Sequence, residues 1–277
     1  MKLVNSDDIY QAISKKLVEL NTQANDCVFG FFQKYEGPFK EEILANFEIA
    51  KKSCIPLCQD TGTVEFFVWK GFEVVTNEPI TKILNSVVRN TYIENGFRKS
   101  IVEDPLFKRK NTNDNTPCIV HFFEVENPIL EIWILIKGGG SENLSMLYMF
   151  EPSEKYEIIK DTIVNHIKMN GSNACPPIRI GIGIGGTSDE ALLLSKLALI
   201  DESIERLNTK VTRYKPFEME IFDEVQKLRI GVQGLGVGDS LYSVKAYGYP
   251  THIATLPVAI SVDCYLVRST KVVILND

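Results

Sequence analysis

The 277-residue sequence lacks the features of several protein classes. No run of about 18 apolar residues occurs, so a membrane-spanning helix is not predicted. The opening residues, MKLVNSDDIYQAISKK, lack the apolar stretch and small-residue cleavage site of a secretory signal. Basic residues are not in excess, since the formal net charge is -6 and the pI is near 5.3. We therefore expect a cytoplasmic protein with no membrane or nucleic-acid partner.

Markers of a modular chain are also missing. No internal repeat, low-complexity run or Pro/Ser-rich linker divides the sequence, and a hydrophobic content of 44% is enough to bury a sizeable core. We predict one domain over residues 1–277, with a possible division into two subdomains near residues 141–175.

Hydrophobic periodicity predicts helices and strands in mixed order. Ser6 is the expected cap of the first helix, in which Ile9, Ile13, Leu17 and Leu20 recur on one side. Further helices are expected near 38–53, 83–96, 154–169, 190–200 and 218–228. Strands are expected near 64–70, 72–75, 118–125, 129–137, 178–184, 242–249 and 257–267. The strands at 118–125 and 129–137 are predicted to form a hairpin, and residues 108–117 a polar, mobile surface loop. The predicted fold class is mixed α/β, with sheets flanked by helices.

Two glycine-rich segments call for an explanation. Gly181, Gly183 and Gly186 match G-x-G-x-x-G, the dinucleotide fingerprint, but Asp201 follows a helical stretch instead of the second strand that the fingerprint requires. The turn GGTSDE could instead aim backbone N–H groups at an anion, or be an ordinary helix cap. KGGGSEN at 137–143 allows close approach of a ligand, or simply a tight turn.

The six cysteines contain no C-x-x-C pair. Cys54 and Cys58 are four residues apart and no second close pair exists, which argues against a zinc ribbon or a redox dithiol. Cys58 precedes Gln-Asp-Thr-Gly, Cys175 precedes Pro-Pro, and Cys264 ends a late strand, so all three lie where an element meets a polar turn. They could converge on a metal or be dispersed thiols. The others are expected to be small core or surface residues: Cys27, Cys54 and Cys118.

Five motifs in the same order together resemble a known family: PLCQDTGT, NTYIENGFRKS, KGGGSEN, CPPIRIGIGIGGTSDEALLLSKLAL and YPTHIATLPVAISVDC. The chain is similar to the class I, iron-sulfur-dependent fumarases and L-tartrate dehydratases along nearly its whole length. The match covers the N-terminal half of that family, which in many bacteria and archaea is a separate α subunit. The implied fold has sheets flanked by helices and a cluster site in a central cleft.

The resemblance implies a 4Fe-4S cluster held by Cys58, Cys175 and Cys264. A cluster with three thiolates keeps one iron open as a Lewis acid, whereas four thiolates would close it and suit electron transfer. The implied reaction is the reversible hydration of a dicarboxylate, with fumarate to (S)-malate as the first candidate.

The same resemblance suggests substrate-binding and catalytic residues. It makes Asp60 the acid that protonates the departing hydroxyl, with Gln59 binding substrate. The alternative for Asp60 is an Asx-turn onto the following residues. Arg98 matches a position that binds a substrate carboxylate, for which a planar bidentate donor is well suited.

Other positions follow in the same way. Gly139 and Gly140 match a stretch whose backbone approaches the substrate. His252 matches a catalytic and substrate-binding histidine near the substrate carboxylate, although a lone histidine is more often a packed or surface residue. The chain departs from the family after Cys264, where it reads YLVRS, although the expected arginine is in place at Arg268.

The chain ends at Asp277, without the domain that by resemblance carries the base and further arginines. We therefore expect a β subunit as partner and an α homodimer within an α2β2 assembly. Two alternatives stay open: the α subunit of an L(+)-tartrate dehydratase, and a non-catalytic homologue that binds a cluster or a carboxylate for regulation.

Overall fold

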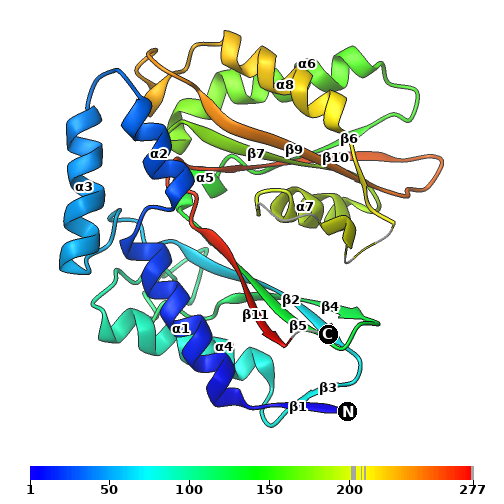
Figure 1. The fold of residues 1–277 in the computed structure, drawn as a ribbon. Helices are drawn as coiled ribbons and strands as arrows, with labels where there is room; N and C mark the ends of the chain where they lie inside the picture. The colour runs from blue at the N-terminus through cyan, green and yellow to red at the C-terminus, as the bar shows by residue number, and fades with distance from the viewer. Residues whose placement is uncertain (201–203, 207, 209, 276–277) are drawn as a thin grey trace. The chain divides into compact units, whose positions relative to one another are not determined.

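A computed structural model of the chain describes residues 1–275, except 201–203, 207 and 209. The chain forms two compact units. Unit 1 comprises Met1–Gln33, Glu41–Gly138 and Arg268–Asp277, and unit 2 comprises Lys34–Lys40 and Gly139–Val267. Both contain helices and a mixed sheet, so the predicted mixed α/β class is confirmed (Figure 1). None of the described helices is long and apolar enough to cross a membrane.

Unit 1 contains a four-stranded sheet in the order β11-β5-β2-β4 and a parallel pair of β1 with β3. Its helices are α1 (Ser6–Thr22), α2 (Asp26–Lys34), α3 (Lys40–Ser53) and α4 (Ile80–Glu94). Its strands are β1 (Lys2–Val4), β2 (Thr63–Gly71), β3 (Val74–Thr76), β4 (Ile119–Val125), β5 (Leu130–Lys137) and β11 (Ser269–Leu275).

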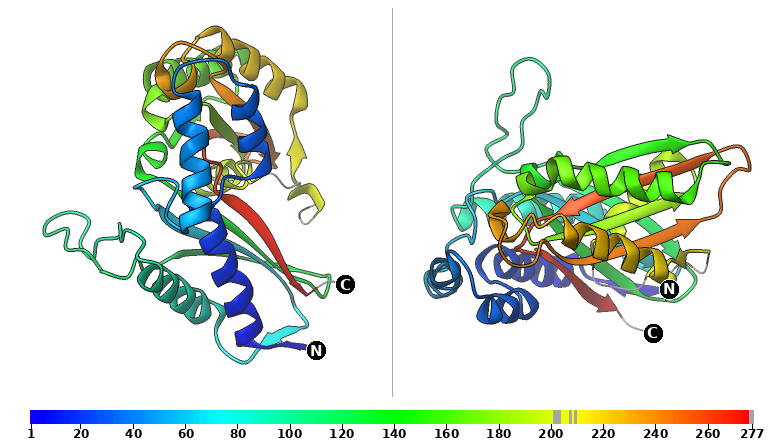
Figure 2. Two further views of the ribbon diagram at one scale, coloured as in Figure 1. Left: turned by 60° about the vertical axis from the view of Figure 1, so that its left-hand side comes forward. Right: turned by 90° about the horizontal axis from the view of Figure 1, so that it is seen from above.

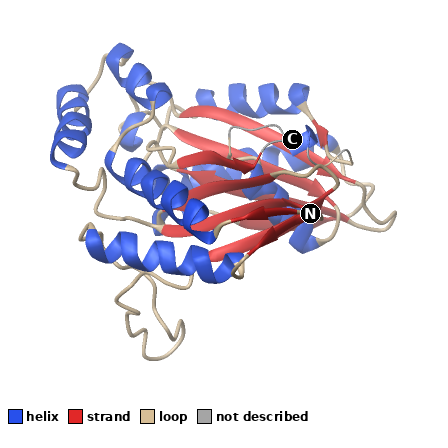
Figure 3. Cartoon of the chain, turned by 60° about the horizontal axis from the view of Figure 1, so that its bottom comes forward, coloured by secondary structure: helices blue, strands red, loops and turns tan. Residues whose placement is uncertain are grey.

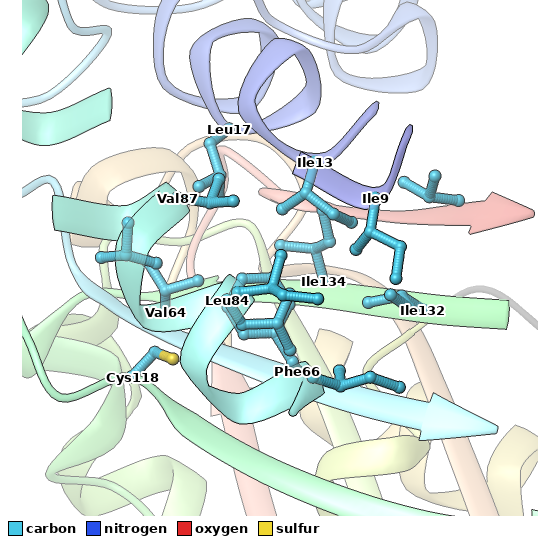
Figure 4. Packing of buried hydrophobic residues seen from close by; sticks show 14 of the residues in the cluster. Ile9, Ile13, Leu17, Val64, Phe66, Leu84, Val87, Cys118, Ile132 and Ile134 are labelled. Atoms are coloured by element: carbon cyan, nitrogen blue, oxygen red, sulfur yellow. The ribbon is translucent and has the colours of Figure 1, made fainter. Parts of the chain in front are cut away.

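The core of unit 1 lies between its sheet and the helices α1 and α4, which Figure 3 shows lying against the strands. Side chains spaced three or four residues apart form the buried stripe of each helix, as expected for an amphipathic helix against a sheet. Figure 4 shows this packing, with α1, α4, β2 and β5 each contributing apolar side chains. The labelled residues are Ile9, Ile13, Leu17, Val64, Phe66, Leu84, Val87, Cys118, Ile132 and Ile134.

The predicted hairpin of β4 with β5 is wrong. Strand β2 lies between them, antiparallel to β5 and parallel to β4. The side chains of β2 are almost all buried, whereas those of β4 alternate between exposed and half-buried. A strand buried on both faces takes a central position and a half-polar strand takes the edge, so local sequence order does not decide the pairing.

The first helix begins at Ser6 as expected, but Ser6 is not its cap. Asn5 is the N-cap, and its side chain accepts a hydrogen bond from the backbone N–H of Asp7 at 3.1 Å. Asparagine and serine are equally good caps, and the extended backbone of Asn5 gives it this position. The polar loop predicted at 108–117 is a surface loop between α4 and β4 (Figure 2).

Unit 2 is built on a five-stranded sheet in the order β6-β10-β7-β9-β8. Its helices are α5 (Gly139–Glu142), α6 (Tyr156–Asn170), α7 (Ser188–Leu197) and α8 (Lys215–Lys227), with 3-10 turns η1 (Gly171–Ala174), η2 (Ile204–Arg206) and η3 (Val232–Gly234). Its strands are β6 (Met146–Phe150), β7 (Ile178–Gly185), β8 (Thr212–Arg213), β9 (Leu241–Tyr249) and β10 (Leu256–Asp263). Helices α6 and α8 cover one face of this sheet and α7 the other (Figure 1).

The glycines of the G-x-G-x-x-G pattern have a packing role. Gly181 and Gly183 lie within β7 itself, where a Cβ would come 2.0 Å from the carbonyl oxygens of Ser195 and Ala191 in α7. Their absence of a side chain lets the helix lie directly on the strand. The dinucleotide interpretation therefore loses its main support, and Asp201 lies outside the described residues.

Candidate active site

The first part of the candidate site is the turn at Cys58–Gly62 in unit 1. The Asp60 carboxylate accepts a hydrogen bond from the backbone N–H of Gly62 at 3.0 Å, which closes an Asx-type turn. The backbone N–H of Asp60 points to the Cys58 sulfur at 3.4 Å. Gly62 has φ of +75°, and a Cβ there would lie 2.7 Å from the carbonyl oxygen of Lys137. Only glycine fits this position, so the turn has a defined shape.

Hydrogen bonds fasten this turn to α4 and to the residues that follow it. The Tyr92 hydroxyl donates to the carbonyl oxygen of Thr61 at 2.7 Å, and the Thr61 hydroxyl donates to the carbonyl oxygen of Arg98 at 2.5 Å. Thr61 is buried, while the side chains of Gln59 and Arg98 are exposed. Unit 1 thus brings Cys58, Asp60 and the Arg98 backbone together.

A buried arginine lies beside Asp60. A Cβ built on Gly138 would meet Asp60 Oδ2 at 2.8 Å and Arg268 Nη2 at 3.8 Å, so both charged groups flank this glycine. Arg268 is 3% exposed, and its Nη1 donates to Asn21 Oδ1 at 3.3 Å. Burial raises the pKa of Tyr92 to about 12, while the charge of Arg268 lowers it and that of Asp60 raises it. Both charges therefore act on the same hydroxyl.

The other two candidate thiols lie together in unit 2. The backbone N–H of Tyr265 donates to the carbonyl oxygen of Cys175 at 3.2 Å, which holds the segments of Cys175 and Cys264 side by side. Cys175 has φ of 52° between η1 and Pro176, a left-handed conformation that is uncommon for a residue with a side chain. Its side chain is exposed and that of Cys264 is half-buried.

A buried ion pair supports this end of the sheet. Arg179 Nη2 lies 2.6 Å from Asp263 Oδ2, with side-chain exposures of 7% and 0%. The two residues are opposite each other in the antiparallel pairing of β7 with β10. Asp263 Oδ1 also accepts the backbone N–H of Cys264 at 2.9 Å. The pair therefore joins β7, which follows Cys175, to β10, which precedes Cys264.

The glycines at 139 and 140 begin the short helix α5 of unit 2. Both are exposed, and a Cβ on Gly140 would lie 3.1 Å from the carbonyl oxygen of Asn173, two residues before Cys175. An ion pair of Lys196 with Glu142 at 3.1 Å connects α7 to α5. The glycine backbone thus lies close to the segment that leads to Cys175.

His252 lies at a different place in unit 2. It lines a cavity of about 510 Å³ together with residues of the glycine turn, including Gly186, Thr187 and Ser188. Strand β10 begins four residues after His252 and ends directly before Cys264, so the seven steps between its eight residues separate the two by roughly 24 Å at about 3.4 Å per step. Unit 2 does not bring His252 to Cys175 and Cys264.

The donor chemistry of the three candidate ligands fits an iron-sulfur cluster. None of the six cysteines forms a disulfide, and Cys58, Cys175 and Cys264 all lie in turns with exposed or half-buried side chains. Cys118 contrasts with them, because burial raises the pKa of its thiol to about 12 and keeps it protonated. Among the residues that the structure describes, no three His, Cys, Asp or Glu side chains are grouped to hold a single metal ion.

Sequence reasoning did not single out the surroundings of Asp60. The motifs indicate Arg268 only as a position shared with the family and Gly138 only as one glycine of KGGGSEN, and they do not indicate Asn21. Asn21 and Arg268 are 247 residues apart, so no local pattern connects them. A polar residue on the apolar side of the first helix was the one available signal, since Asn21 follows Ile13 and Leu17 at helical spacing and is buried.

Comparison with known proteins identifies the family to which the chain belongs. The family model described as fumarate hydratase (Fumerase) matches residues 33–273. The putative L(+)-tartrate dehydratase subunit alpha of Methanocaldococcus jannaschii is 36% identical over 82% of this chain and 80% of its own length. The anaerobic class I fumarate hydratase of Escherichia coli is 32% identical over 83% of the chain and 43% of its own length. The L(+)-tartrate dehydratase subunit alpha of E. coli is 30% identical over 77% of this chain and 70% of its own length.

The chain thus spans less than half of the class I fumarate hydratase that it matches, and most of the tartrate dehydratase alpha subunits. The family model covers well over half of the chain, and the names of these relatives are those of hydro-lyases. The chain belongs to the fumarate hydratase family of hydro-lyases.

Proposed function

We propose that the chain is the α subunit of a 4Fe-4S-dependent hydro-lyase that converts fumarate to (S)-malate and back. The observation that carries the proposal is the Cys58–Gly62 turn, in which a thiol and a carboxylate are held two residues apart by backbone hydrogen bonds. A hydro-lyase needs a metal site and an acid at the leaving hydroxyl, and this turn supplies residues for both.

Cys58, Cys175 and Cys264 would hold the cluster. With three thiolate ligands, the bound cluster supplies one open iron as a Lewis acid for the substrate hydroxyl and carboxylate. The closeness of the Cys175 and Cys264 segments in unit 2 supports the assignment of these two. Cys54 is exposed, lies on the other side of the Ile-Pro-Leu segment, and is assigned no part in ligation.

Asp60 is the proposed acid. Hydroxide is a poor leaving group, so a carboxylic acid must donate a proton to it as the bond breaks. Oδ1 of Asp60 accepts the Gly62 N–H, which fixes the direction of the carboxyl group and directs Oδ2 toward Gly138. Gln59, with its exposed amide, and Arg98, with its exposed guanidinium, are proposed to bind the dicarboxylate.

Gly139 and Gly140 are proposed to present their backbone to the substrate, which their exposure and their position near Asn173 support. His252 is proposed to take part in binding and proton transfer at a substrate carboxylate. Since β10 separates it from Cys264 within one unit, this role requires that a second copy of the chain carry His252 to the site. That requirement agrees with the proposed α homodimer within an α2β2 assembly.

The proposed partner is a β subunit that carries the base and further carboxylate-binding groups. Two tartrate dehydratase relatives are named as alpha subunits, and the fumarate hydratase that the chain matches is more than twice as long as the matched part. The proposed cellular location is the cytoplasm, where a reducing environment preserves thiolate ligands.

The test is anaerobic reconstitution of the chain followed by addition of the β subunit. We expect about four irons and four sulfides per chain, since three thiolates suffice for a cluster of this type. Cys58→Ser, Cys175→Ser and Cys264→Ser should each abolish cluster binding, and Cys54→Ser should leave it unchanged. A cluster that persists in all three variants would refute the ligand assignment.

L(+)-tartrate is the second candidate substrate, because the relative with 36% identity is a putative tartrate dehydratase alpha subunit. Steady-state rates of the reconstituted pair on fumarate, (S)-malate and L(+)-tartrate decide between the two. Turnover of tartrate with a kcat/KM above that for malate would replace the first candidate. An absence of turnover with all three would favour a non-catalytic regulatory protein.

A further inference from the structure

We propose that Arg268 is a positioning residue for Asp60, and that Gly138 leaves the space in which the two side chains lie next to each other. The inference rests on the proposed function, because it gives the orientation of Asp60 a catalytic purpose. It concerns unit 1 alone, to which all three residues belong.

The geometry around Gly138 is the first step. A Cβ at this position would come 2.8 Å from Asp60 Oδ2, which is closer than real Cβ contacts, and 3.8 Å from Arg268 Nη2. The φ of Gly138 is not in the left-handed region, so backbone conformation does not demand glycine there. The reason for glycine is therefore steric: the Asp60 carboxylate occupies the place of a side chain.

The second step is the way in which Arg268 is held. It lies directly before β11, where its carbonyl oxygen accepts the backbone N–H of Ile136, and its Nη1 donates to Asn21 at the end of α1. Asn21 is itself fixed, since its Nδ2 donates to the carbonyl oxygen of Leu17 at 2.9 Å and its own carbonyl oxygen accepts the N–H of Leu57 at 2.7 Å. The backbone of Arg268 and one end of its guanidinium are therefore both held, which makes the side chain a defined reference for a neighbouring carboxylate.

The third step concerns charge. Arg268 is 3% exposed, and its Nε–H is buried without an acceptor among the residues that the structure describes. A buried cation requires a counter-charge, and Asp60 is the carboxylate beside it at Gly138. The charge of Arg268 lowers the pKa of the Tyr92 hydroxyl and the charge of Asp60 raises it.

A purely structural role for Arg268 would need only its contact with Asn21, which joins β11 to α1. Such a role would not explain why the space at Gly138 is kept open for the carboxylate, nor why Nε lacks an acceptor. The two roles differ in what happens to Asp60 when the guanidinium is removed, and this difference is measurable.

The kinetic test uses the reconstituted α chain with its β partner. Arg268→Gln should lower kcat by about 100-fold with KM changed less than about threefold, because a displaced acid loses rate while the binding groups stay in place. Arg268→Lys should have a kcat about tenfold higher than Arg268→Gln, since lysine restores the positive charge but not the planar guanidinium. Iron content should match the wild type. Arg89→Gln, at an arginine paired with Asp114 on the surface, is the control and should be fully active.

A double-mutant cycle separates the two roles. If Arg268 acts through Asp60, Arg268→Gln should cost little more once Asp60→Asn has removed the acid, so the two losses will not multiply. Multiplicative losses would overturn the proposal.

A readout that does not depend on turnover is the position of Asp60 in crystal structures of the cluster-free α chain. In both Arg268→Gln and Gly138→Ala, the carboxyl group should leave its place beside residue 138. An unmoved Asp60 in Arg268→Gln would overturn the proposal, whatever the activity. If the wild-type pair has no turnover with any substrate, the proposed function fails, and these structures alone decide whether Arg268 positions Asp60.

Discussion

Cys118 shows how strongly the surroundings of a single residue decide its chemistry. Its thiol is 7% exposed and lies at the edge of the unit 1 core beside Val64 and Leu84 (Figure 4). Burial raises its pKa from 9.0 to about 12, so ionisation is suppressed in the folded chain. The candidate ligand thiols, in contrast, lie in turns at the surface of their units. The same residue type is therefore inert in one place and available in the others.

This difference predicts a dependence of stability on pH. Because the folded pKa of Cys118 lies above the unfolded one, its contribution is complete below about pH 9 and is lost as the pH rises toward 12. By pH 10 the loss amounts to about 1.4 kcal/mol. We expect Cys118→Ala to be less stable than the wild type at pH 7 but to lose about 1.4 kcal/mol less between pH 8 and pH 10 in urea unfolding. Cys27→Ala, at an exposed position, is the control and should follow the wild type. If the free energy of unfolding falls equally between pH 8 and pH 10 in all three proteins, the thiol of Cys118 ionises normally in the folded chain.

At the scale of elements, strands β7 and β10 with helix α7 determine the position of two candidate ligands. Cys175 precedes β7 and Cys264 follows β10, and the two strands are antiparallel neighbours. Their register sets Arg179 opposite Asp263, and the glycines of β7 let α7 approach closely. The ion pair therefore lies at the cysteine end of the sheet, and the contact with α7 lies further along β7.

Loss of the ion pair should be costly. Asp263→Ala leaves the Arg179 guanidinium buried without this carboxylate, and breaking such a pair costs about 3–5 kcal/mol. We expect a loss of this size in the free energy of unfolding, measured in urea.

A matched control is Glu224→Ala, which removes an exposed ion pair with Lys227 and should change stability by less than about 0.5 kcal/mol. Similar small effects for both variants would mean that the buried pair contributes little.

The contact between α7 and β7 gives a second prediction at this scale. In Gly183→Ala the new methyl group would lie 2.0 Å from the Ala191 carbonyl oxygen, so the helix must shift. Overpacking of this kind costs about 1–3 kcal/mol, and we expect at least that loss in thermal or urea unfolding.

Gly30→Ala is the control, because nothing lies within 4 Å of a Cβ at this position in α2. Alanine in a helix should stabilise it by about 0.5–1 kcal/mol. If Gly183→Ala leaves the free energy of unfolding unchanged, a methyl group fits between β7 and α7, and the close contact at Gly183 is not required.

At the scale of the whole chain, each unit has a core of its own. The buried cluster of unit 1 contains Phe66 and Ile134, and that of unit 2 contains Ile182 and Ile260. Both units are formed from more than one stretch of the chain, which passes from unit 1 to unit 2 after Gly138 and returns at Arg268.

Separate cores predict separate responses to core mutations. Phe66→Ala should increase amide hydrogen exchange chiefly in unit 1 (residues 1–33, 41–138 and 268–275), and Ile260→Ala chiefly in residues 139–267 of unit 2, because a cavity weakens the core in which it lies. Hydrogen-exchange mass spectrometry with peptide resolution measures both. Equal acceleration throughout the chain in either variant would show that the two units unfold as one.

Much of the local structure could be predicted. The apolar stripes of α1 and α4, the strand, glycine turn and helix that begin at Ile178, and α6 up to Asn170 agree with periodicity and with Gly or Asn signals. The elements α2, α5, β1, β6, β8 and β11 were missed; α5, β1 and β8 have four residues or fewer, which is too few to form a recognisable pattern. The prediction of a β4–β5 hairpin was wrong, because strand pairing depends on burial across the whole sheet.

The sequence by itself determined the family and the residue types at the candidate site, because both depend on motifs of a few adjacent residues such as the Cys58–Gly62 turn. Only the tertiary structure decided which distant residues meet. It set Arg268 beside Asp60 and bonded it to Asn21, joined the Cys175 and Cys264 segments, and kept His252 at the far end of β10. The physical reason is that such contacts arise from the packing of whole strands and helices, whereas local sequence specifies only the conformation of each one.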